Sequence, residues 1–297
     1  MQNALKTICF GEILWDKFPD GKALGGAPLN VALRLLSLGA DSSIISRLGT
    51  DALAEETWNK LDNYNLNQDL IQTDDDLKTG IVDVTLDDSG AASYIINKPV
   101  AWDAIELTDR NAKKVSESDL FIFGSLACRS EKSRTTLYTL IQKADKTVFD
   151  VNLRAPHYDL DQVVELIKQA DVIKMNDDEL EEICKFLDFD MNSLKDGLYY
   201  LNEFSKADTI CVTRGGEGAI LLHEGKYYSS NGYPTKVVDT VGAGDSFLAG
   251  LLFTLFSENN PQKALEFGCA LGALVAGQKG ANARIEKQEI LNKISEN

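Results

Sequence analysis

Residues Asp239 to Phe247 read D-T-V-G-A-G-D-S-F, and an apolar stripe at helical spacing follows them to Leu255. This spacing predicts a helix over 243–257 that begins in glycine-rich main chain, with the carboxylate of Asp245 on its first turn. The free N–H groups and about half a positive charge from the helix dipole make such a turn a binding place for phosphate. An acid beside a phosphate suits a base that takes the proton of an attacking hydroxyl.

The same letters also fit a plain strand-to-helix turn, with Asp245 as a first-turn acid that suits the dipole. The whole run, however, closely resembles the second signature of the ribokinase-like (PfkB) carbohydrate kinases. Residues 24–39, L-G-G-A-P-L-N-V-A-L-R-L-L-S-L-G, resemble the first signature. The resemblance implies that Asp245 is the catalytic base, and that the main chain of Gly242, Ala243 and Gly244 forms an anion hole for the transferred phosphoryl group.

Composition narrows the class of protein. The chain has 297 residues, of which 44% are hydrophobic, enough for one large α/β domain or two small ones. The net charge of −16 without a basic face argues against nucleic-acid or anionic membrane partners. Five scattered cysteines without a C-x-x-C, and two histidines, argue against a zinc site or a disulfide framework. Neither a signal-peptide pattern nor a membrane-length apolar run is apparent, so we expect a cytoplasmic setting.

Short β-rich runs alternate with amphipathic stretches, which is typical of a mainly parallel, doubly wound sheet covered on both faces by helices. The predicted strands are Thr7–Phe10, Ser43–Arg47, Leu120–Phe123, Thr147–Asp150, Val172–Met175, Thr209–Thr213, Ala219–His223 and Lys236–Asp239. The predicted helices are Pro28–Leu38, Glu131–Ala144, Asp161–Gln169, Asp177–Leu187, Leu194–Phe204, Ala243–Ser257 and Gln262–Gly277. Ligands of such sheets bind at the carboxyl ends of the strands, and Asp245 follows the last predicted strand.

One stretch breaks the alternation. Gly80–Leu86 and Ser93–Ile96, joined by D-D-S-G at 87–90, predict a β-hairpin. It is either an edge extension or a lid, and the family resemblance favours a lid made of residues 12–23 and 79–102. We therefore expect one three-layer ribokinase-like domain over residues 1–297. The hairpin could equally clasp a second copy of the chain, so a homodimer stays open.

Gly25 and Gly26 allow a ligand to approach the main chain closely, and Asn30 offers a donor and acceptors that match a sugar hydroxyl. A glycine turn with a solvated Asn30 is the plain alternative. The resemblance implies that these residues face the sugar, and that Asp16, in G-E-I-L-W-D, accepts from two sugar hydroxyls. Arg154 ends D-V-N-L-R, a segment similar to the fructokinase branch; it faces a sugar or a phosphate, or makes a rim salt bridge.

Asn176 and Glu179 fit a capping box, a device worth about 1 kcal/mol. The resemblance implies that the same N-x-x-E holds the magnesium–phosphate assembly, partly through water, and the two roles are compatible. Residues 212–218, V-T-R-G-G-E-G, resemble the nucleotide turn of the family. That resemblance assigns Thr213, Gly215 and Gly218 to phosphate or ribose contacts, whereas the plain alternative is a β-turn between two strands.

In relatives a monovalent cation lies beneath the anion hole, and Asp239 and Gly280 are the candidates here for binding such an ion, potassium for instance. No G-x-x-x-x-G-K-[ST] occurs, which excludes a P-loop mechanism. No G-x-G-x-x-G follows the first strand, which counts against a dinucleotide enzyme.

The resemblance implies an ATP-dependent, magnesium-dependent kinase for a primary hydroxyl of a small sugar, most similar to fructokinases that make fructose 6-phosphate. Two other acceptors remain open: 2-keto-3-deoxygluconate, whose carboxylate would need Arg154 or Arg129, and ribose or a nucleoside. A sugar-binding sensor without catalysis would be expected to lack the base or the glycines, and both are present.

Overall fold

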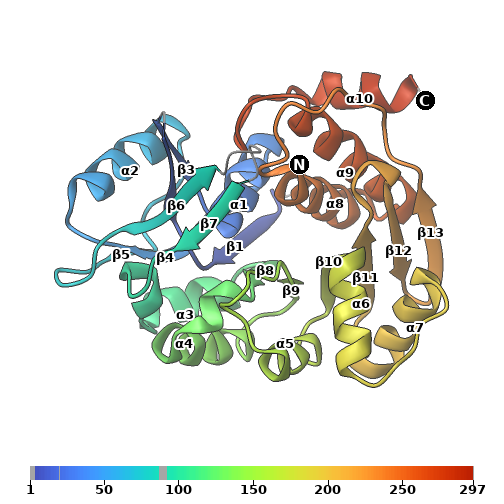
Figure 1. Cartoon of the computed structure of the whole chain (residues 1–297), viewed down its shortest axis with the longest axis horizontal. Coiled ribbons are helices and arrows are strands. Elements are labelled where there is room, and N and C mark those ends of the chain that lie inside the picture. The colour runs from blue at the N-terminus through green and yellow to red at the C-terminus, as the bar shows by residue number, and fades with distance from the viewer. Residues whose placement is uncertain (1–3, 20, 87–91, 297) are drawn as a thin grey trace.

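The computed structural model describes residues 4–19, 21–86 and 92–296. Its main element is a nine-stranded sheet in the order β13-β12-β11-β10-β9-β8-β1-β4-β5 (Figure 1). All neighbouring strands are parallel except β11–β12 and β12–β13, which are antiparallel. The strands are β1 Lys6–Phe10, β4 Asp41–Leu48, β5 Ile71–Thr73, β8 Leu120–Gly124, β9 Thr147–Asp150, β10 Val172–Asn176, β11 Thr209–Thr213, β12 Ala219–His223 and β13 Lys226–Ser230.

Helices cover both faces of this sheet, as expected for a parallel sheet whose strands are apolar on both sides. One face packs against α3 Asp109–Ser116, α4 Glu131–Ile141, α5 Leu160–Ile167, α6 Asp177–Phe186 and α7 Leu194–Ser205. The other packs against α1 Ala27–Leu38, α2 Ala52–Asn63, α8 Ala243–Glu258, α9 Pro261–Ala276 and α10 Lys287–Ser295. This three-layer arrangement confirms the predicted doubly wound fold.

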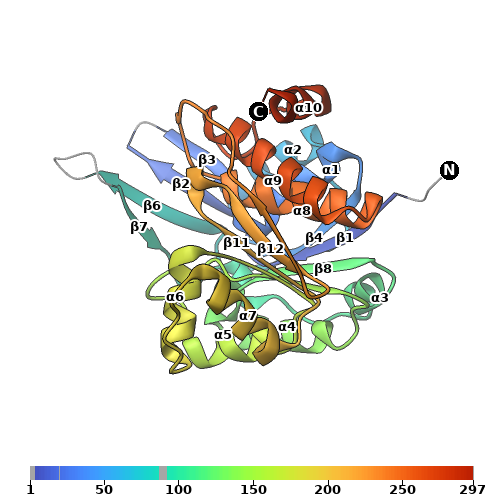
Figure 2. The same cartoon turned by 90° about the vertical axis from the view of Figure 1, so that its right-hand side faces the viewer.

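A second sheet of four strands has the order β3-β2-β6-β7. It consists of β2 Leu14–Phe18, β3 Gly21–Gly25, β6 Gly80–Leu86 and β7 Ala92–Ile96. Figure 2 shows β6 and β7 extending away from the large sheet. The hairpin strands agree with the sequence expectation, and β2 pairs with β6 in parallel. The predicted turn at 87–90 lies outside the described residues.

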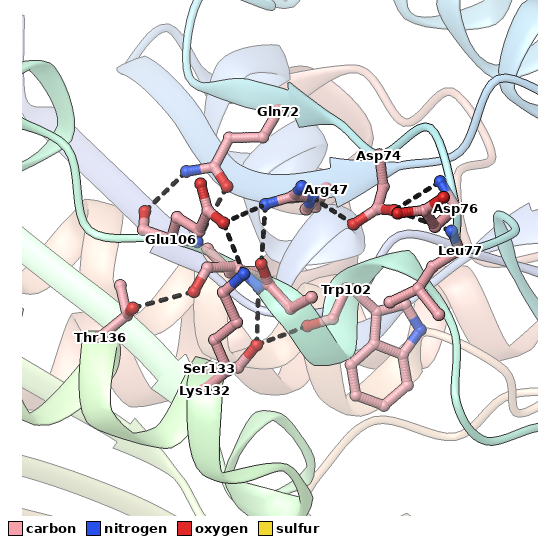
Figure 3. Close-up of polar contacts among 12 residues, drawn as sticks. Arg47, Gln72, Asp74, Asp76, Leu77, Trp102, Glu106, Lys132, Ser133 and Thr136 are labelled. Carbon is pink, nitrogen blue, oxygen red and sulfur yellow. Dashed lines mark hydrogen bonds and ion pairs between the residues drawn. The ribbon is translucent and has the colours of Figure 1, made fainter.

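The connections of this small sheet are tied to the edge of the large one (Figure 3). The carboxylate of Asp74, after β5, accepts from the N–H groups of Asp76 and Leu77 at 3.0 and 2.7 Å and pairs with Arg47 of β4 at 2.7 Å. Arg47 also donates to the carbonyl of Ala104 at 3.0 Å, in the short helix η1 Ala101–Ala104 that follows β7. One guanidinium therefore holds both the entry to β6 and the exit from β7.

The predicted strand Lys236–Asp239 is wrong, because this segment is a loop. Its valines face solvent, with Val237 60% and Val238 59% exposed. The N–H groups of Val238 and Asp239 both donate to the carbonyl of Ala276, at the end of α9, rather than to a neighbouring strand. The sheet instead ends in β13, ten residues earlier, and a long loop from 231 to 242 leads into α8.

Candidate functional site

Helix α8 begins at a residue that only glycine can occupy. Gly242, its N-cap, has a φ of 75°, and a Cβ there would lie 2.3 Å from the Cβ of Ala281. Gly242 has no side chain with which to cap the helix. The N–H of Ala243 donates to the carbonyl of Thr240 at 3.2 Å, so the N–H groups of Gly244 and Asp245 are the first-turn donors left for another acceptor. Gly244 is exposed, and Asp245 is the only acidic residue of the first turn.

Asn30 links this turn to the N-terminal part of the chain. It lies in the first turn of α1, where Pro28 suits the helix start. Its amide Nδ2 donates to Oδ2 of Asp245 at 2.8 Å, and its Oδ1 accepts from Nδ2 of Asn282 at 3.0 Å. The amide of Asn30 is therefore fixed from both sides and is not the solvated side chain of the plain alternative.

The carboxylate of Asp245 is tuned towards proton uptake. Burial and then the charge of Asp150 raise the pKa of Asp245 to about 6, whereas the hydrogen bond from Asn30 and the charges of Lys174 and Arg154 lower it. A carboxylate with a pKa near 6 is ionised at neutral pH and is a stronger base than an ordinary aspartate.

A buried ion pair lies beside the glycine turn. Lys174 of β10 binds Oδ1 of Asp150 at 2.9 Å, and both side chains are buried. Oδ2 of Asp150 is buried without a hydrogen-bond partner within the described part of the chain. A Cβ on Gly244 would lie 3.4 Å from Nζ of Lys174, so this ammonium faces the start of α8. Burial lowers the pKa of Lys174, but the charges of Asp150, Glu179 and Asp245 outweigh it and leave the pKa raised, so the lysine is charged.

Two more carboxylates lie around the double glycine. A Cβ on Gly25 would lie 2.9 Å from Oδ2 of Asp16, and a Cβ on Gly26, whose φ is 116°, would lie 2.3 Å from the carbonyl oxygen of Glu12. Burial raises the pKa of Asp16 to about 6 and that of Glu12 to about 7. The nearby main chain of Glu12 and Ala27 partly offsets this rise in the pKa of Glu12.

The two arginines considered from sequence have different surroundings. Arg154 is exposed, and its charge lowers the pKa values of Glu12, Asp16 and Asp245, so it faces this group of carboxylates. Its guanidinium donates to the neighbouring carbonyl of Leu153 at 3.2 Å, and no ion pair holds it within residues 4–19, 21–86 and 92–296.

Arg129, in contrast, is engaged with its own chain. Its side chain is 2% exposed, pairs with both carboxylate oxygens of Asp103 at 2.7 and 2.8 Å, and lies 3.8 Å from the ring centre of Trp102. It also donates to the carbonyl of Asn97 at 2.6 Å. Such an arginine has no donor pair left for a substrate carboxylate.

Asn176 and Glu179 form the predicted capping box at the start of α6. Each side chain bonds the main-chain N–H of the other, at 2.7 and 2.8 Å. The second carboxylate oxygen of Glu179 accepts the N–H of Leu153 at 2.8 Å, and burial raises its pKa. Both oxygens are therefore occupied, which leaves water-mediated contact as the way for this pair to hold a hydrated ion.

The predicted nucleotide turn follows β11. Thr213 lies opposite Asn176 in the parallel pair β10–β11. The turn and the capping box therefore lie side by side at the carboxyl ends of these two strands. Gly215 has a φ of 54° with open space around it, whereas a Cβ on Gly218 would lie 2.1 Å from the carbonyl of Ser230. Gly218 is thus required for packing, and Gly215 remains accessible to a ligand.

Asp239 and Gly280, the candidates for a monovalent cation, are in direct contact. Oδ2 of Asp239 accepts the N–H of Gly280 at 2.9 Å, and Oδ1 accepts that of Val241 at 3.0 Å. In the part of the chain that is described, no group of three or more His, Cys, Asp or Glu side chains could hold a metal ion. Any cation here would need main-chain or ligand oxygens.

Sequence reasoning missed four side chains of this region: Glu12, Arg34, Lys174 and Asn282. Two of them had a signal. Lys174 interrupts the apolar run V-I-K-M of a predicted strand, and Arg34 lies four residues after Asn30, on the same face of its helix. Asn282 had none, because only the tertiary structure brings it to Asn30.

Comparison with known proteins identifies the family. The model of the pfkB family of carbohydrate kinases matches residues 11–288. The chain belongs to this family. It is 30% identical to an Arabidopsis thaliana protein named "Probable fructokinase-5", over 95% of this chain and 94% of that protein, and 28% identical to the fructokinase of Salmonella typhimurium, over 97% and 98%.

Solved structures of sugar kinases share the fold. The fructokinase of Xylella fastidiosa, solved with bound ATP, has a TM-score of 0.86 and 23% identity over 98% of both chains. A 2-dehydro-3-deoxygluconokinase of Thermotoga maritima has a TM-score of 0.85 and 21% identity over 99% of both. These structures show the ribokinase-like fold, and the family match and the curated relatives make the chain an ATP-dependent carbohydrate kinase. Among the described residues, no helix is both long and apolar enough to cross a membrane.

Proposed function

We propose that this pfkB kinase transfers the γ-phosphoryl group of ATP to a primary hydroxyl of fructose and so makes fructose 6-phosphate. Fructokinases among the relatives support the choice of acceptor. One observation carries the chemistry: the 2.8 Å bond that holds Asp245 against Asn30 at an uncapped, glycine-rich helix start. This bond joins Asn30 to Asp245 at the start of α8, although the two residues are 215 positions apart. In the proposal it brings together the base, the amide that faces the sugar and the turn that binds phosphate.

In this proposal Asp245 takes the proton of the hydroxyl, and the amides of Gly242, Ala243 and Gly244 stabilise the migrating phosphoryl group. The Ala243 amide would exchange its bond to the carbonyl of Thr240 for one to this group. Such donors are often worth about 3 kcal/mol each in the transition state. Asp16, with the main chain at Gly25 and Gly26 and the amide of Asn30, orients the sugar.

The remaining cations and turns would serve the nucleotide. Arg154 faces the phosphates or the sugar rim, and Lys174 adds a fixed charge beneath the anion hole. Thr213, with the main chain at Gly215 and Gly218, would contact phosphate or ribose.

Magnesium fits this site as a water-held ion. The Asn176–Glu179 pair would orient its water shell, since the oxygens of Glu179 already accept main-chain N–H groups. When bound, the ion would neutralise phosphate charge. A monovalent ion such as potassium would lie at Asp239 and Gly280.

We also infer a single domain over residues 1–297, in which residues 12–23 and 79–102 act as a lid that keeps water from the phosphoryl group. The contacts of Arg47 with Asp74 and Ala104 support this role. They fix the connections before β6 and after β7, and they do not involve the opposite end of the hairpin. All five cysteines are buried, unpaired thiols, which suits a cytoplasmic protein. The alternative to a lid is that the small sheet clasps a second copy of the chain in a homodimer.

An acceptor panel tests the choice of sugar. With MgATP we expect fructose to give the highest kcat/KM among fructose, 2-keto-3-deoxygluconate, ribose and a nucleoside. The engagement of Arg129 by Asp103 disfavours the acidic acceptor, because Arg154 alone would have to bind its carboxylate. A higher kcat/KM for any other acceptor would refute fructose as the substrate while keeping the kinase.

The role of Asp245 is tested by Asp245→Asn. We expect kcat to fall about 10²–10⁴-fold with sugar and ATP still bound, as for loss of a general base. The measurements are steady-state kinetics and calorimetric binding of each substrate. Near-normal turnover would exclude Asp245 as the base, and sugar binding by the wild type without turnover would indicate a sensor.

A further inference from the structure

Arg34 is a buried cation without a counter-ion. It lies in the middle of α1, is 4% exposed, and is paired with no carboxylate within 4 Å in the ranges that the structure describes. Burial lowers its pKa. A guanidinium taken out of water without an acid partner is costly, and an apolar side chain at this position would avoid that cost. Its presence therefore calls for a function.

The guanidinium is held by three neutral oxygens around the phosphate-binding turn. Nε donates to Oγ of Ser246 at 3.1 Å, and one terminal nitrogen donates to the carbonyls of Ala281 and Ala283 at 3.4 and 2.9 Å. Ser246 directly follows the proposed base. The two carbonyls belong to the residues on either side of Asn282, so Arg34 fixes the main chain before and after this residue.

Residues 281–283, which Arg34 holds, are linked to the proposed base through Asn30 and contact the proposed anion hole. Asn282 donates to Asn30, which in turn donates to Asp245. Ala281 packs so tightly on Gly242 that a Cβ on that glycine would lie 3.2 Å from the Ala281 carbonyl oxygen, an acceptor of Arg34. Arg34 therefore contacts the Gly242 turn through the carbonyl of Ala281, and it is linked to Asp245 through the side chains of Asn282 and Asn30.

We propose that Arg34 is a positioning residue for phosphoryl transfer, a built-in cation that holds residues 281–283 against the Gly242 turn and keeps Asn30 aligned with Asp245. The inference rests on the proposed function of Asp245. Arg34 touches neither sugar nor nucleotide in this arrangement, so its loss should affect kcat and the ionisation of Asp245 rather than substrate binding.

The first test is Arg34→Met. We expect kcat to fall about 10–100-fold while the KM values for fructose and MgATP stay within about twofold. The hydrogen bond from Asn30 lowers the pKa of Asp245, so a misaligned Asn30 should move the acidic limb of the kcat/KM profile to higher pH. Arg34→Lys keeps the charge but not the planar fork, and should give an intermediate kcat.

A matched control separates positioning from stability. Leu36→Ala removes a half-buried side chain two residues further along the same helix, and should lower Tm without changing kcat or the acidic limb. In Arg34→Ala, added guanidinium chloride at millimolar concentration should restore part of kcat, whereas urea and sodium chloride should not.

Unchanged kcat and an unmoved acidic limb in Arg34→Met, with Asp245→Asn inactive, would overturn the role of Arg34 and leave the proposed base intact. Full turnover in Asp245→Asn would instead remove the foundation of both. Equal losses of kcat in Arg34→Met and Leu36→Ala, without rescue by guanidinium in Arg34→Ala, would make Arg34 a structural residue only.

Discussion

Asp245, Asp16 and Glu12 share one physical condition: burial raises the pKa of each carboxyl group above its usual range. The roles of the first two residues could be predicted from sequence, because the segments that contain them, D-T-V-G-A-G-D and G-E-I-L-W-D, resemble those of pfkB kinases. Their ionisation could not, since burial comes from segments far apart in the chain. Lys174 and Arg34 are a similar case. The sequence shows a charged residue within an apolar stripe, but it does not show which oxygen atoms accept its hydrogen bonds.

Asp245 should weaken the fold at neutral pH. Its pKa rises from an ordinary 3.8 to about 6 on folding, so the folded state holds the proton more tightly and stability falls as pH rises from 4 to 6. We expect Asp245→Asn to be more stable than the wild type at pH 8, by roughly 1–3 kcal/mol. Urea unfolding at pH 8 and at pH 4 measures this, and an equal gain at both values would contradict it.

Lys174 should be needed for turnover beyond its part in the ion pair. Lys174→Met leaves Asp150 buried and unpaired, which costs roughly 3–5 kcal/mol. Lys174→Met/Asp150→Leu should regain most of the stability but stay at least tenfold below wild-type kcat, because the charge facing Gly244 is still absent. Thermal unfolding and steady-state kinetics on the same samples decide, and full activity in the double variant would reduce Lys174 to a counter-ion.

At the scale of elements, strongly apolar runs were predictable and weakly apolar ones were not. Strands β9, β11 and β12 coincide with their predictions. Helices α2, α3 and α10 were not predicted, because they bury only three, two and one residues and so carry few apolar side chains that would mark them in the sequence. Two exposed valines made residues 236–239 resemble a strand. The N–H groups of Val238 and Asp239 instead bond the carbonyl of Ala276, a contact with α9 that the sequence alone does not reveal.

The pair of Arg47 and Asp74 at the base of the small sheet can be tested by mutation, and the pair of Lys132 and Glu106 beside it is the control (Figure 3). Arg47→Met breaks a mostly buried pair with Asp74 and frees both connections of the sheet, which should destabilise the protein by roughly 3 kcal/mol and raise the KM for fructose more than that for ATP. Lys132→Met removes an exposed pair with Glu106, which is worth about 0–1 kcal/mol, and should change neither. An unchanged fructose KM in Arg47→Met would argue against a lid role for the sheet.

For the whole molecule, the net charge of −16 should slow the approach of an anionic nucleotide. Charges further apart than about 8 Å are largely screened at physiological ionic strength. We therefore expect kcat/KM for MgATP to increase, on the order of twofold, between 10 and 150 mM salt. The value for uncharged fructose should stay constant and is the internal control. A decrease for MgATP would mean that Lys174 and Arg154 outweigh the global charge.

The bonds of Asn30 join residues 215 and 252 positions apart. A chain emerging from the ribosome therefore carries its sugar-facing amide almost from the beginning, yet cannot fix it until residue 282 has been made. Contacts of such sequence separation form late and slow the folding of a domain. Phosphoryl transfer should accordingly be the last property that a nascent or refolding chain acquires, after most of its secondary structure has formed.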